Sequence, residues 1–440
     1  MISSEAMDRH VLATSPATSS PANSLSRQNY WLMMIVIFSV LITVSGEIEY
    51  AKNGGDEVYD ELTVGSNFTR QAAFLVLALS SVLGTMFVPP ATGKRVYWPL
   101  LLPFIGLIVL GIMSTIWSDL PSMTFKRAMV SSIIIFSGII IGRLWDAKQF
   151  ACALITLSSV FLLISVLLEI YYRSYFFEEY RFSGIFHPSK QAFNCGLLAI
   201  ASTTMYFETK RRGYLALALL ALAFVLLTKS RTGLGATCIA LATVGWVHFN
   251  WNQRFLSLVA VLLVGVATLG ALGAFLPKYE LEKVALLGRD EESADPRKLT
   301  GRLPIWSTAL EEFSERPILG FGYGAFWSKK RLGKYERLNG WALTHSHSAY
   351  IEALVNVGAI GFSIGLGLAL FAYQRFWRMK HDRQHRLAGH LCFAILTLAF
   401  LAGITEIAFI GDGYEAWTLA CTLGFACFSG SSMEGRAEVS

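Results

Sequence analysis

The sequence predicts an all-α protein that crosses a membrane about twelve times, and three observations carry that prediction. Of its 440 residues, 54% are hydrophobic and only 15% are charged, whereas soluble domains average about 25% charged residues. The apolar residues gather in runs close to the roughly 20 residues that cross a bilayer as a helix. One connection, Pro277–Thr344, is far longer than all the others. This composition argues against a soluble enzyme and excludes a largely disordered chain.

The predicted spans follow one another through short polar connections, apart from the long loop between the ninth and the tenth. They are Tyr30–Ser45, Gln71–Val88, Trp98–Trp117, Met129–Leu144, Phe150–Tyr171, Gln191–Phe207, Tyr214–Leu227, Leu234–His248, Phe255–Phe275, Ala349–Phe371, Leu387–Phe409 and Tyr414–Phe428. Only Thr228–Gly233 separates the seventh from the eighth, so these two form either a hairpin or one interrupted helix. Residues 1–29, rich in Ser, Pro, Ala and Thr, are expected to be a disordered tail.

The distribution of Lys and Arg predicts the orientation, because cytoplasmic loops carry an excess of both. The larger share falls on the cytoplasmic side if both termini, including the short tail 429–440, lie there. The acidic segment Glu47–Glu61 and the long loop then lie outside. In that loop, Pro304–Phe313 has the spacing of a short amphipathic helix, and Pro317–Gly324 is a glycine-punctuated turn. We therefore expect the chemistry on the outer face, at the membrane surface.

Two histidines, His345 and His347, lie directly before the tenth span. Histidine acts as a general base near neutral pH, and the positive end of a helix dipole lowers the pKa of an imidazole beside it. Gly358 and Gly361 follow on one predicted helix face, where small residues allow close helix packing. Two alternatives stay open: interfacial histidines that cap the helix, or a pair of metal ligands, for which no third ligand is evident nearby.

Three arginines of the predicted outer face, Arg181, Arg231 and Arg302, are the second candidate group. A charged residue at membrane depth is costly and suggests a function. The planar, always charged guanidinium matches the oxygens of a diphosphate. The alternative is that each arginine snorkels to the membrane surface or pairs with a carboxylate such as Glu178 or Glu179.

Taken in order, these residues resemble the O-antigen ligase and Wzy-type polysaccharide polymerase superfamily of bacterial inner-membrane proteins. The most specific match is the signature His-[Asn/Ser/Gln]-x9-Gly-x-x-Gly, which here begins at His347-Ser348 and ends at Gly358 and Gly361. Further matches are Trp117-Ser-Asp-Leu-Pro121 with Thr124 and Arg127, Arg181-Phe-Ser-Gly-Ile-Phe186, Ser230-Arg231-Thr232, Thr300-Gly-Arg302 with Trp306, and Pro317 with Gly320-Phe-Gly322. The chain departs from the family at His187-Pro-Ser-Lys190, where relatives often have His-Pro-Asn.

The resemblance implies a single transmembrane glycosyltransferase domain over residues 30–428, with residues 277–347 as its periplasmic loop. It implies metal-independent inverting glycosyl transfer, without a cofactor, from an oligosaccharide on an undecaprenyl diphosphate carrier. His347 would take the proton of the acceptor hydroxyl, and Arg181, Arg231 and Arg302 would hold the diphosphate. His345 would assist in binding the substrate. The implied setting is the bacterial inner membrane, with the active site on the periplasmic side.

Three functions remain in competition. The first is a polymerase that joins repeat units into exopolysaccharide or O-antigen, and it is favoured because the chain broadly resembles exopolysaccharide-production members of the family. The second is a ligase that transfers finished chains to lipid A-core, and it uses the same motifs. The third is a transporter of polysaccharide or lipid-linked sugar, which internal repeats and midplane charges would favour. The expected partners are the lipid-linked donor, an acceptor glycan or lipid A-core, the bilayer and possibly a chain-length regulator protein, but no nucleic acid.

Overall fold

The computed structural model describes residues 21–43, 68–90, 94–172, 180–248, 302–339, 345–380, 382, 385–407 and 411–429. Most of these residues are helical. The helices are α1 (Pro21–Thr43), α4 (Phe68–Phe87), α5 (Trp98–Met113), α6 (Pro121–Leu144), α7 (Ala147–Tyr172), α8 (Pro188–Thr209), α9 (Arg212–Leu227), α10 (Arg231–His248), α14 (Arg302–Phe313), α15 (Lys329–Asn339), α16 (Ala349–Met379), α17 (Arg386–Gly403) and α18 (Tyr414–Cys427). A 3-10 turn, Ser114–Ile116, extends α5. Two short strands, β1 (Arg95–Val96) and β2 (Phe428–Ser429), pair antiparallel.

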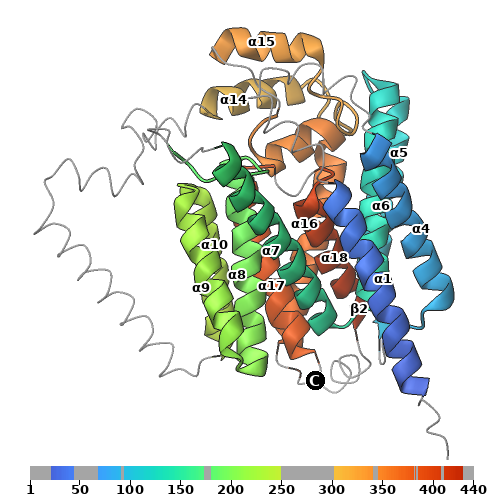
Figure 1. The fold of residues 1–440 in the computed structure, drawn as a ribbon. Helices are drawn as coiled ribbons and strands as arrows, with labels where there is room; N and C mark the ends of the chain where they lie inside the picture. The colour runs from blue at the N-terminus through green and yellow to red at the C-terminus, as the bar shows by residue number, and fades with distance from the viewer. Residues whose placement is uncertain are drawn as a thin grey trace, which may run out of the picture.

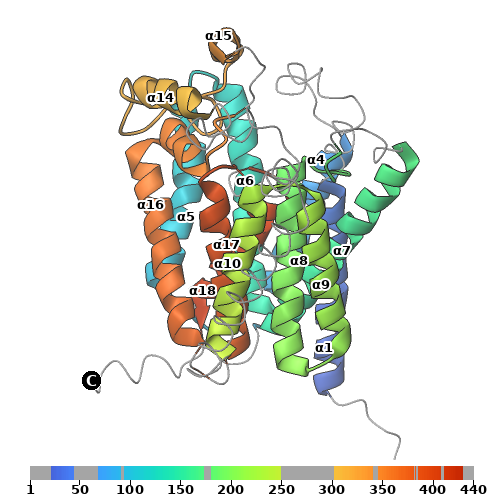
Figure 2. The same ribbon diagram turned by 90° about the vertical axis from the view of Figure 1, so that its left-hand side faces the viewer.

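The long helices run side by side as a bundle, and the two short helices α14 and α15 lie across one end of it (Figure 1). We call α14, α15 and the connection between them the cap, residues 302–339. Figure 2 shows from a second direction that the cap covers only this end. The first residue of α1 and the strand β2 lie at the opposite end. The described chain therefore starts and finishes on the side of the bundle away from the cap.

The helices agree with most of the predicted spans. Six are long and apolar enough to cross a membrane: α4, α5 with its 3-10 turn, α6, α7, α16 and α17. Within the described residues, shorter or less apolar helices occupy the other predicted spans, and α14 confirms the predicted amphipathic helix. The ninth predicted span, Phe255–Phe275, lies outside the described residues, so the count of twelve stays a prediction. The protein is thus a helical, multi-pass membrane protein.

Several helix bounds differ from the prediction, and α1 begins at Pro21, within the tail that was expected to be disordered. The eleventh span was expected to continue to Phe409, but α17 ends at Gly403. The chain turns there, and Glu406 pairs with Arg302 of the cap instead of continuing along the bundle. In addition, α15 was not predicted, because its sequence is strongly polar and contains few apolar residues. Two of these, Leu332 and Tyr335, are buried. Those two side chains pack into the core of the cap. This packing stabilises a helix whose sequence has only a weak amphipathic pattern.

Glycines allow α6 and α18 to approach closely. A Cβ atom added to Gly138 would overlap the backbone of Ala420, and one added to Gly142 would overlap the backbone of Gly424. Both pairs are four residues apart, so each helix presents a strip of small residues to the other. Phe150 stacks on Phe425 beside this crossing, with ring centroids 5.1 Å apart. Inside a membrane the hydrophobic effect does not drive helices together, so close van der Waals packing of this kind is a main source of helix association.

The second close approach lies under the cap and corrects the expectation for Gly358. This residue was expected on a helix face, but its φ of 67° and ψ of −172° break α16. The segment Pro317–Gly322 fills the break: Ala359 N–H donates to the carbonyl of Pro317 at 2.8 Å, and Phe321 N–H donates to the carbonyl of Val355 at 2.9 Å. A Cβ at Gly358 would overlap the carbonyl of Ile318. The expectation failed because the partner of Gly358 is a turn and not another helix.

The cap has a small core of its own, which joins it to the start of α16. Ile305, Phe326, Tyr335 and Val355 are fully buried in it. Phe326 lies against the edge of Trp327, with ring centroids 4.9 Å apart. Because this core includes residues of α16, the cap is held against the bundle by packing as well as by the turn that fills the helix break.

We predict that Gly142→Ala destabilises the protein, because the added methyl group overlaps the backbone of Gly424. Overpacking of this kind typically costs about 1–3 kcal/mol. The matched control is Gly235→Ala in α10, where an added Cβ meets nothing within 4 Å and alanine is the better helix former. Thermal unfolding of both variants in detergent is the measurement. A Gly142→Ala protein as stable as Gly235→Ala would contradict the close crossing of α6 and α18.

Candidate functional site

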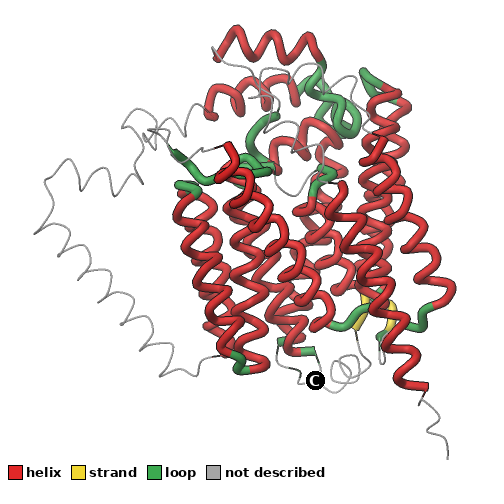
Figure 3. The backbone as a smooth tube through the Cα atoms, in the orientation of Figure 1, coloured by secondary structure: helices red, strands yellow, loops and turns green. Residues whose placement is uncertain are grey.

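Four segments that are distant in sequence meet beneath the cap. They are the start of α8, the start of α14, the loop before α16 and the end of α17. Figure 3 shows described loops, drawn in green, gathered at this end of the bundle below α14. The ionisable residues that influence one another electrostatically here are His187, Lys190, Arg302, His345, His347 and Glu406. Only Arg302, His345 and His347 of this group were predicted as site residues, and the structure brings these three together.

The loop His345–Ser348 has a defined internal geometry. The rings of His345 and His347 lie edge to face, with centroids 4.1 Å apart. The backbone N–H of His347 donates to Nδ1 of His345 at 3.2 Å, so a neutral His345 carries its proton on Nε2. His347 has a φ of 53°, a left-handed conformation that side chains other than glycine rarely adopt. Such conformations persist only where the surroundings enforce them, and they gather at functional sites.

Both imidazoles are electrostatically disfavoured as cations. Burial, with smaller effects of Arg302 and His187, lowers the pKa of His347 to about 3. Burial, followed by the neighbouring His347, holds the pKa of His345 well below its usual value. The direction agrees with the sequence-based expectation, but the main cause is burial rather than the helix dipole. Both side chains are therefore neutral at neutral pH, and a neutral imidazole has a lone pair that accepts a proton.

Arg302, the first residue of α14, reaches the loop from the cap. Its Nη2 atom donates to Oε1 of Glu406 at 2.9 Å. Burial raises the pKa of Glu406, while Arg302, Ser189 and Lys190 oppose that shift. The carbonyl of Glu406 also accepts the N–H of Ala349 at 3.1 Å, so this residue adjoins the start of α16. The expected partners of the arginines were Glu178 and Glu179, which lie outside the described residues; Arg302 pairs with Glu406 instead.

Arg181 and Arg231 form a second cationic group at the same end of the bundle. Nε of Arg181 donates to the carbonyl of Thr228 at 3.2 Å, three residues before Arg231 opens α10. The start of α10 packs tightly on α8, because a Cβ at Gly233 would overlap Ala192. Ala192 lies in the first turns of α8, two residues after Lys190. The second cationic group is thus anchored next to the helix start that carries His187 and Lys190.

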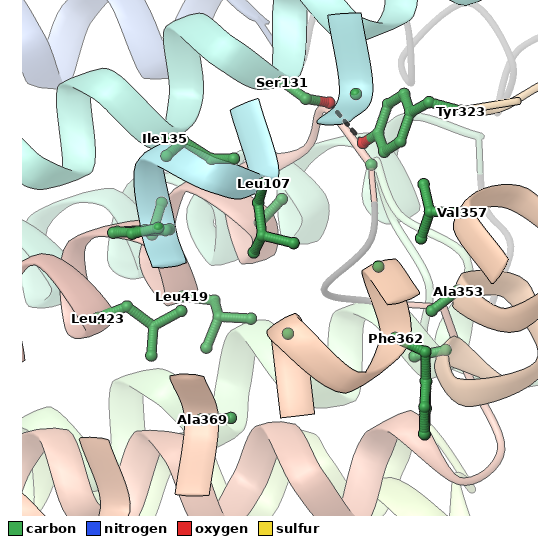
Figure 4. A pocket seen from close by; sticks show the side chains of 18 of the residues that line it. Leu107, Ser131, Ile135, Tyr323, Ala353, Val357, Phe362, Ala369, Leu419 and Leu423 are labelled. Carbon is green, nitrogen blue, oxygen red and sulfur yellow. Dashed lines mark hydrogen bonds between the residues drawn. The ribbon is translucent and has the colours of Figure 1, made fainter. Parts of the chain in front are cut away.

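A mainly apolar cavity of about 290 Å³ opens between α5, α6, α16, α17 and α18. Leu107, Ile135, Phe362, Leu419 and Leu423 point into it (Figure 4). Its polar edge is formed at the cap side, where the hydroxyls of Ser131 and Tyr323 lie 2.6 Å apart. Ala349, the second residue after His347, also lines it. The cavity therefore lies among the apolar helices and reaches the first turn of α16, next to the histidine loop.

Sequence analysis missed three ionisable residues of this site. His187 and Lys190 stand where the chain departs from the family pattern, so His187 was given no firm role, and Glu406 was not singled out as a site residue. A carboxylate at the end of an apolar span was the available signal for Glu406, because such a group needs a partner.

Among the residues that the structure describes, no three His, Cys, Asp or Glu side chains are grouped as metal ligands.

Comparison with known proteins finds similar proteins. Residues 216–366 match the family model of O-antigen ligase, a stretch that contains Arg231, Arg302, His345, His347 and both signature glycines. The exopolysaccharide production protein ExoQ of Rhizobium meliloti is 24% identical over 310 residues, which cover 66% of this chain and 68% of that protein. The O-antigen ligase of Pseudomonas aeruginosa is 24% identical over 360 residues, which cover 79% of this chain and 81% of that protein.

A functionally uncharacterized protein of Haemophilus influenzae is also 24% identical, over 219 residues. The family model and the two relatives with named functions support the resemblance drawn from the motifs: the chain carries a stretch that matches the O-antigen ligase family model, and it is similar to an exopolysaccharide production protein and to an O-antigen ligase.

Proposed function

We propose that the protein is an inner-membrane polymerase that joins undecaprenyl-diphosphate-linked oligosaccharide repeat units into exopolysaccharide or O-antigen. The observation that carries the proposal is the geometry that brings the histidine loop and the start of α14 together: Arg302 pairs with Glu406, whose carbonyl accepts the N–H of Ala349, and Trp306 donates to the carbonyl of Ser346. A glycosyl transfer from a diphosphate carrier needs one base, cationic stabilisation of the leaving group and accurate positioning. The cavity supports a substrate with a lipid tail, because it is mainly apolar, lies among the membrane-spanning helices and reaches the first turn of α16.

The proposed step is a single inverting displacement. The hydroxyl oxygen of the acceptor sugar attacks the anomeric carbon of the donor from the face opposite the diphosphate. The bond from that carbon to the diphosphate oxygen breaks, and its electron pair leaves with the diphosphate. The hydroxyl proton passes to His347. Arg302 exchanges its contact with Glu406 for the diphosphate oxygens, and Arg181 and Arg231 supply further positive charge to them.

Binding of the donor would also adjust the base. Arg302 and His187 both add to the lowering of the pKa of His347, and the negative charges of a diphosphate would offset that effect. The imidazole would then become more basic once the leaving group is in place, which brings its pKa toward the range that favours proton transfer. In this proposal, His345 holds its neighbour through the hydrogen bond from the His347 backbone and helps to bind the sugar at the same loop.

A second candidate function is transfer of finished polysaccharide to lipid A-core. It is favoured by the likeness to the O-antigen ligase of Pseudomonas aeruginosa, which covers a larger share of this chain than the likeness to ExoQ does. Deletion of the gene distinguishes the two functions. Loss of polymer, or accumulation of single repeat units, supports the polymerase. Long carrier-linked polymer that never reaches core would support the ligase.

We predict that His347→Ala abolishes polymer formation while the protein stays in the membrane at a near-normal level. Loss of a general base typically lowers the rate roughly 10²–10⁴-fold. The assay uses purified protein in lipid with a carrier-linked donor, and follows release of carrier diphosphate. His385→Ala, which alters a histidine directly before α17 at the opposite end of the bundle, is the control and should retain activity. Wild-type activity in His347→Ala would remove the proposed base.

Substitution of the arginines should show that shape matters as well as charge. Arg231→Ala and Arg302→Ala are expected to lose most activity, whereas Lys at either position restores only part of it, because the guanidinium fork is lost. Arg316→Ala serves as the control, because this arginine pairs with Asp119 at 2.9 Å on an exposed part of the cap. Full activity of the alanine variants would mean that the diphosphate is held elsewhere.

The pH dependence of kcat/KM should report the lowered pKa of His347. An ordinary histidine with a pKa of about 6.5 is about 97% protonated at pH 5 and cannot act as a base. The lowered pKa of His347 keeps it neutral there, so kcat/KM at pH 5 should stay close to its value at pH 7.5. His187→Ala removes one cause of the lowering and should move the acid limb upward. An acid limb near pH 6.5 in the unaltered protein would contradict this assignment.

A further inference from the structure

A buried carboxylate stands behind the histidine loop and has no role in the proposed reaction so far. Glu352 lies in the first turn of α16, and only 7% of it is exposed. Buried glutamates are rare unless their oxygens are paired. The oxygens of Glu352 accept hydrogen bonds from three surrounding side chains and one backbone amide, which belong to the histidine loop, to the cap and to α16.

The contacts with the histidine loop go to the residue between the two histidines. Ser346 is fully buried, its backbone N–H lies 3.3 Å from Oε2 of Glu352, and its hydroxyl lies 2.9 Å from the same oxygen. On the other side, the carbonyl of Ser346 accepts Nε1 of Trp306 at 2.8 Å. Trp306 belongs to α14, the helix that begins with Arg302. The peptide units that join His345 to His347 are therefore held from two opposite sides.

The remaining contacts of Glu352 tie it to the cap and to the next turn of α16. Nε1 of Trp327 lies 3.0 Å and 2.9 Å from the two carboxylate oxygens. Nδ2 of Asn356 donates to Oε1 at 2.8 Å, while Oδ1 of Asn356 accepts the N–H of Phe326 at 3.3 Å. One carboxylate thus connects the histidine loop to the cap and to the rigid first turns of α16.

This network accounts for the conformation of His347. The left-handed backbone at that residue, with a φ of 53°, is disfavoured for a side chain with a Cβ atom. It persists only if its neighbours are fixed. Ser346 precedes it, and the bonds to Glu352 and Trp306 fix Ser346. Release of Ser346 would let the loop relax to an ordinary backbone conformation and swing the imidazole of His347 away from Arg302.

From this geometry, we propose that Glu352 is a positioning residue of the glycosyl transfer: its carboxylate holds Ser346 and thereby aims His345 and His347 at the reacting groups. This inference rests on the proposed function. Glu352 acts through Ser346 and does not touch the substrate. The carboxylate is required because several donors converge on its two oxygens. The glutamine amide has one acceptor oxygen, and its NH2 group would face donors. Charged acceptors also make the stronger hydrogen bonds.

The test compares Glu352→Gln with Glu312→Gln in the full-length protein in lipid. Glu312 is a matched control, because it is also buried, at 8% exposure, but its carboxylate accepts from Arg331 and Lys334 of α15 at 2.7 and 2.8 Å. We expect Glu352→Gln to lower kcat about 10- to 100-fold, as misplacement of a reacting group by about 1 Å does. The KM for the carrier-linked donor should change little. Glu312→Gln should keep both constants.

A double-mutant cycle separates positioning from general destabilisation. Ser346→Ala should lower kcat in the same way as Glu352→Gln. The kcat of the double variant should lie only a little below that of the less active single variant. The combination of Ser346→Ala with Glu312→Gln should add no further loss. Kinetic constants are expressed per folded molecule, as measured by size-exclusion chromatography in detergent. If Glu352→Gln does not fold, Ser346→Ala alone tests the inference through the same fall in kcat at unchanged KM.

The outcomes distinguish this inference from the proposed function. Full kcat in Glu352→Gln and Ser346→Ala, together with an inactive His347→Ala, would overturn the positioning role and leave the proposed base intact. Independent, multiplicative losses in the double variant would also overturn it, because Glu352 would then act by a route other than Ser346. Activity that survives in His347→Ala would instead remove the proposed function itself.

Discussion

At Gly358 the backbone of α16 leaves the helical conformation, and the turn Pro317–Gly322 supplies the hydrogen-bond partners that the break exposes. Non-helical backbone near a membrane is tolerated where protein surrounds it, and the turn provides that surrounding. The contact fixes the cap to α16, and the cap carries Arg302 and Trp306 to the histidine loop. The arrangement of the candidate site therefore depends on one close backbone contact that only glycine permits at Gly358.

Cationic side chains gather in the candidate site. Lys190 and Arg302 share the space beneath the cap with two neutral imidazoles and with Glu406, which pairs with Arg302. Positive charge that is held in a partly buried place favours an anionic ligand. Burial lowers the pKa of His347 most, and positive charge adds to that effect, so binding of an anion and readiness to accept a proton are linked. This linkage explains why a base and its neighbouring cations can serve a single transfer step.

Rigid packing on both sides of the bundle supports this geometry. The close crossing of α6 and α18 packs the end of the bundle away from the cap tightly. The aromatic core around Phe326 and Tyr335 keeps the cap in place. Glu352, at the start of α16, joins the cap to the histidine loop, because its hydrogen bonds reach both. A small displacement of these supporting residues would misalign the reacting groups, and misalignment lowers the rate of reactions that require accurate positioning.

The sequence by itself determined the helical membrane class, most of the helix positions and the signature that runs from His347 to Gly361, because these depend on local composition, hydrophobic runs and spacing. It also identified Arg302 as a candidate, from the type of residue and its setting. Only the tertiary structure decided that Glu406 pairs with Arg302, that His187 and Lys190 join the histidines and that Glu352 holds Ser346. It also decided that Gly358 breaks α16 to receive a turn about forty residues away. Contacts between segments distant in sequence follow from which helix ends meet in the folded bundle, and no local pattern encodes that meeting.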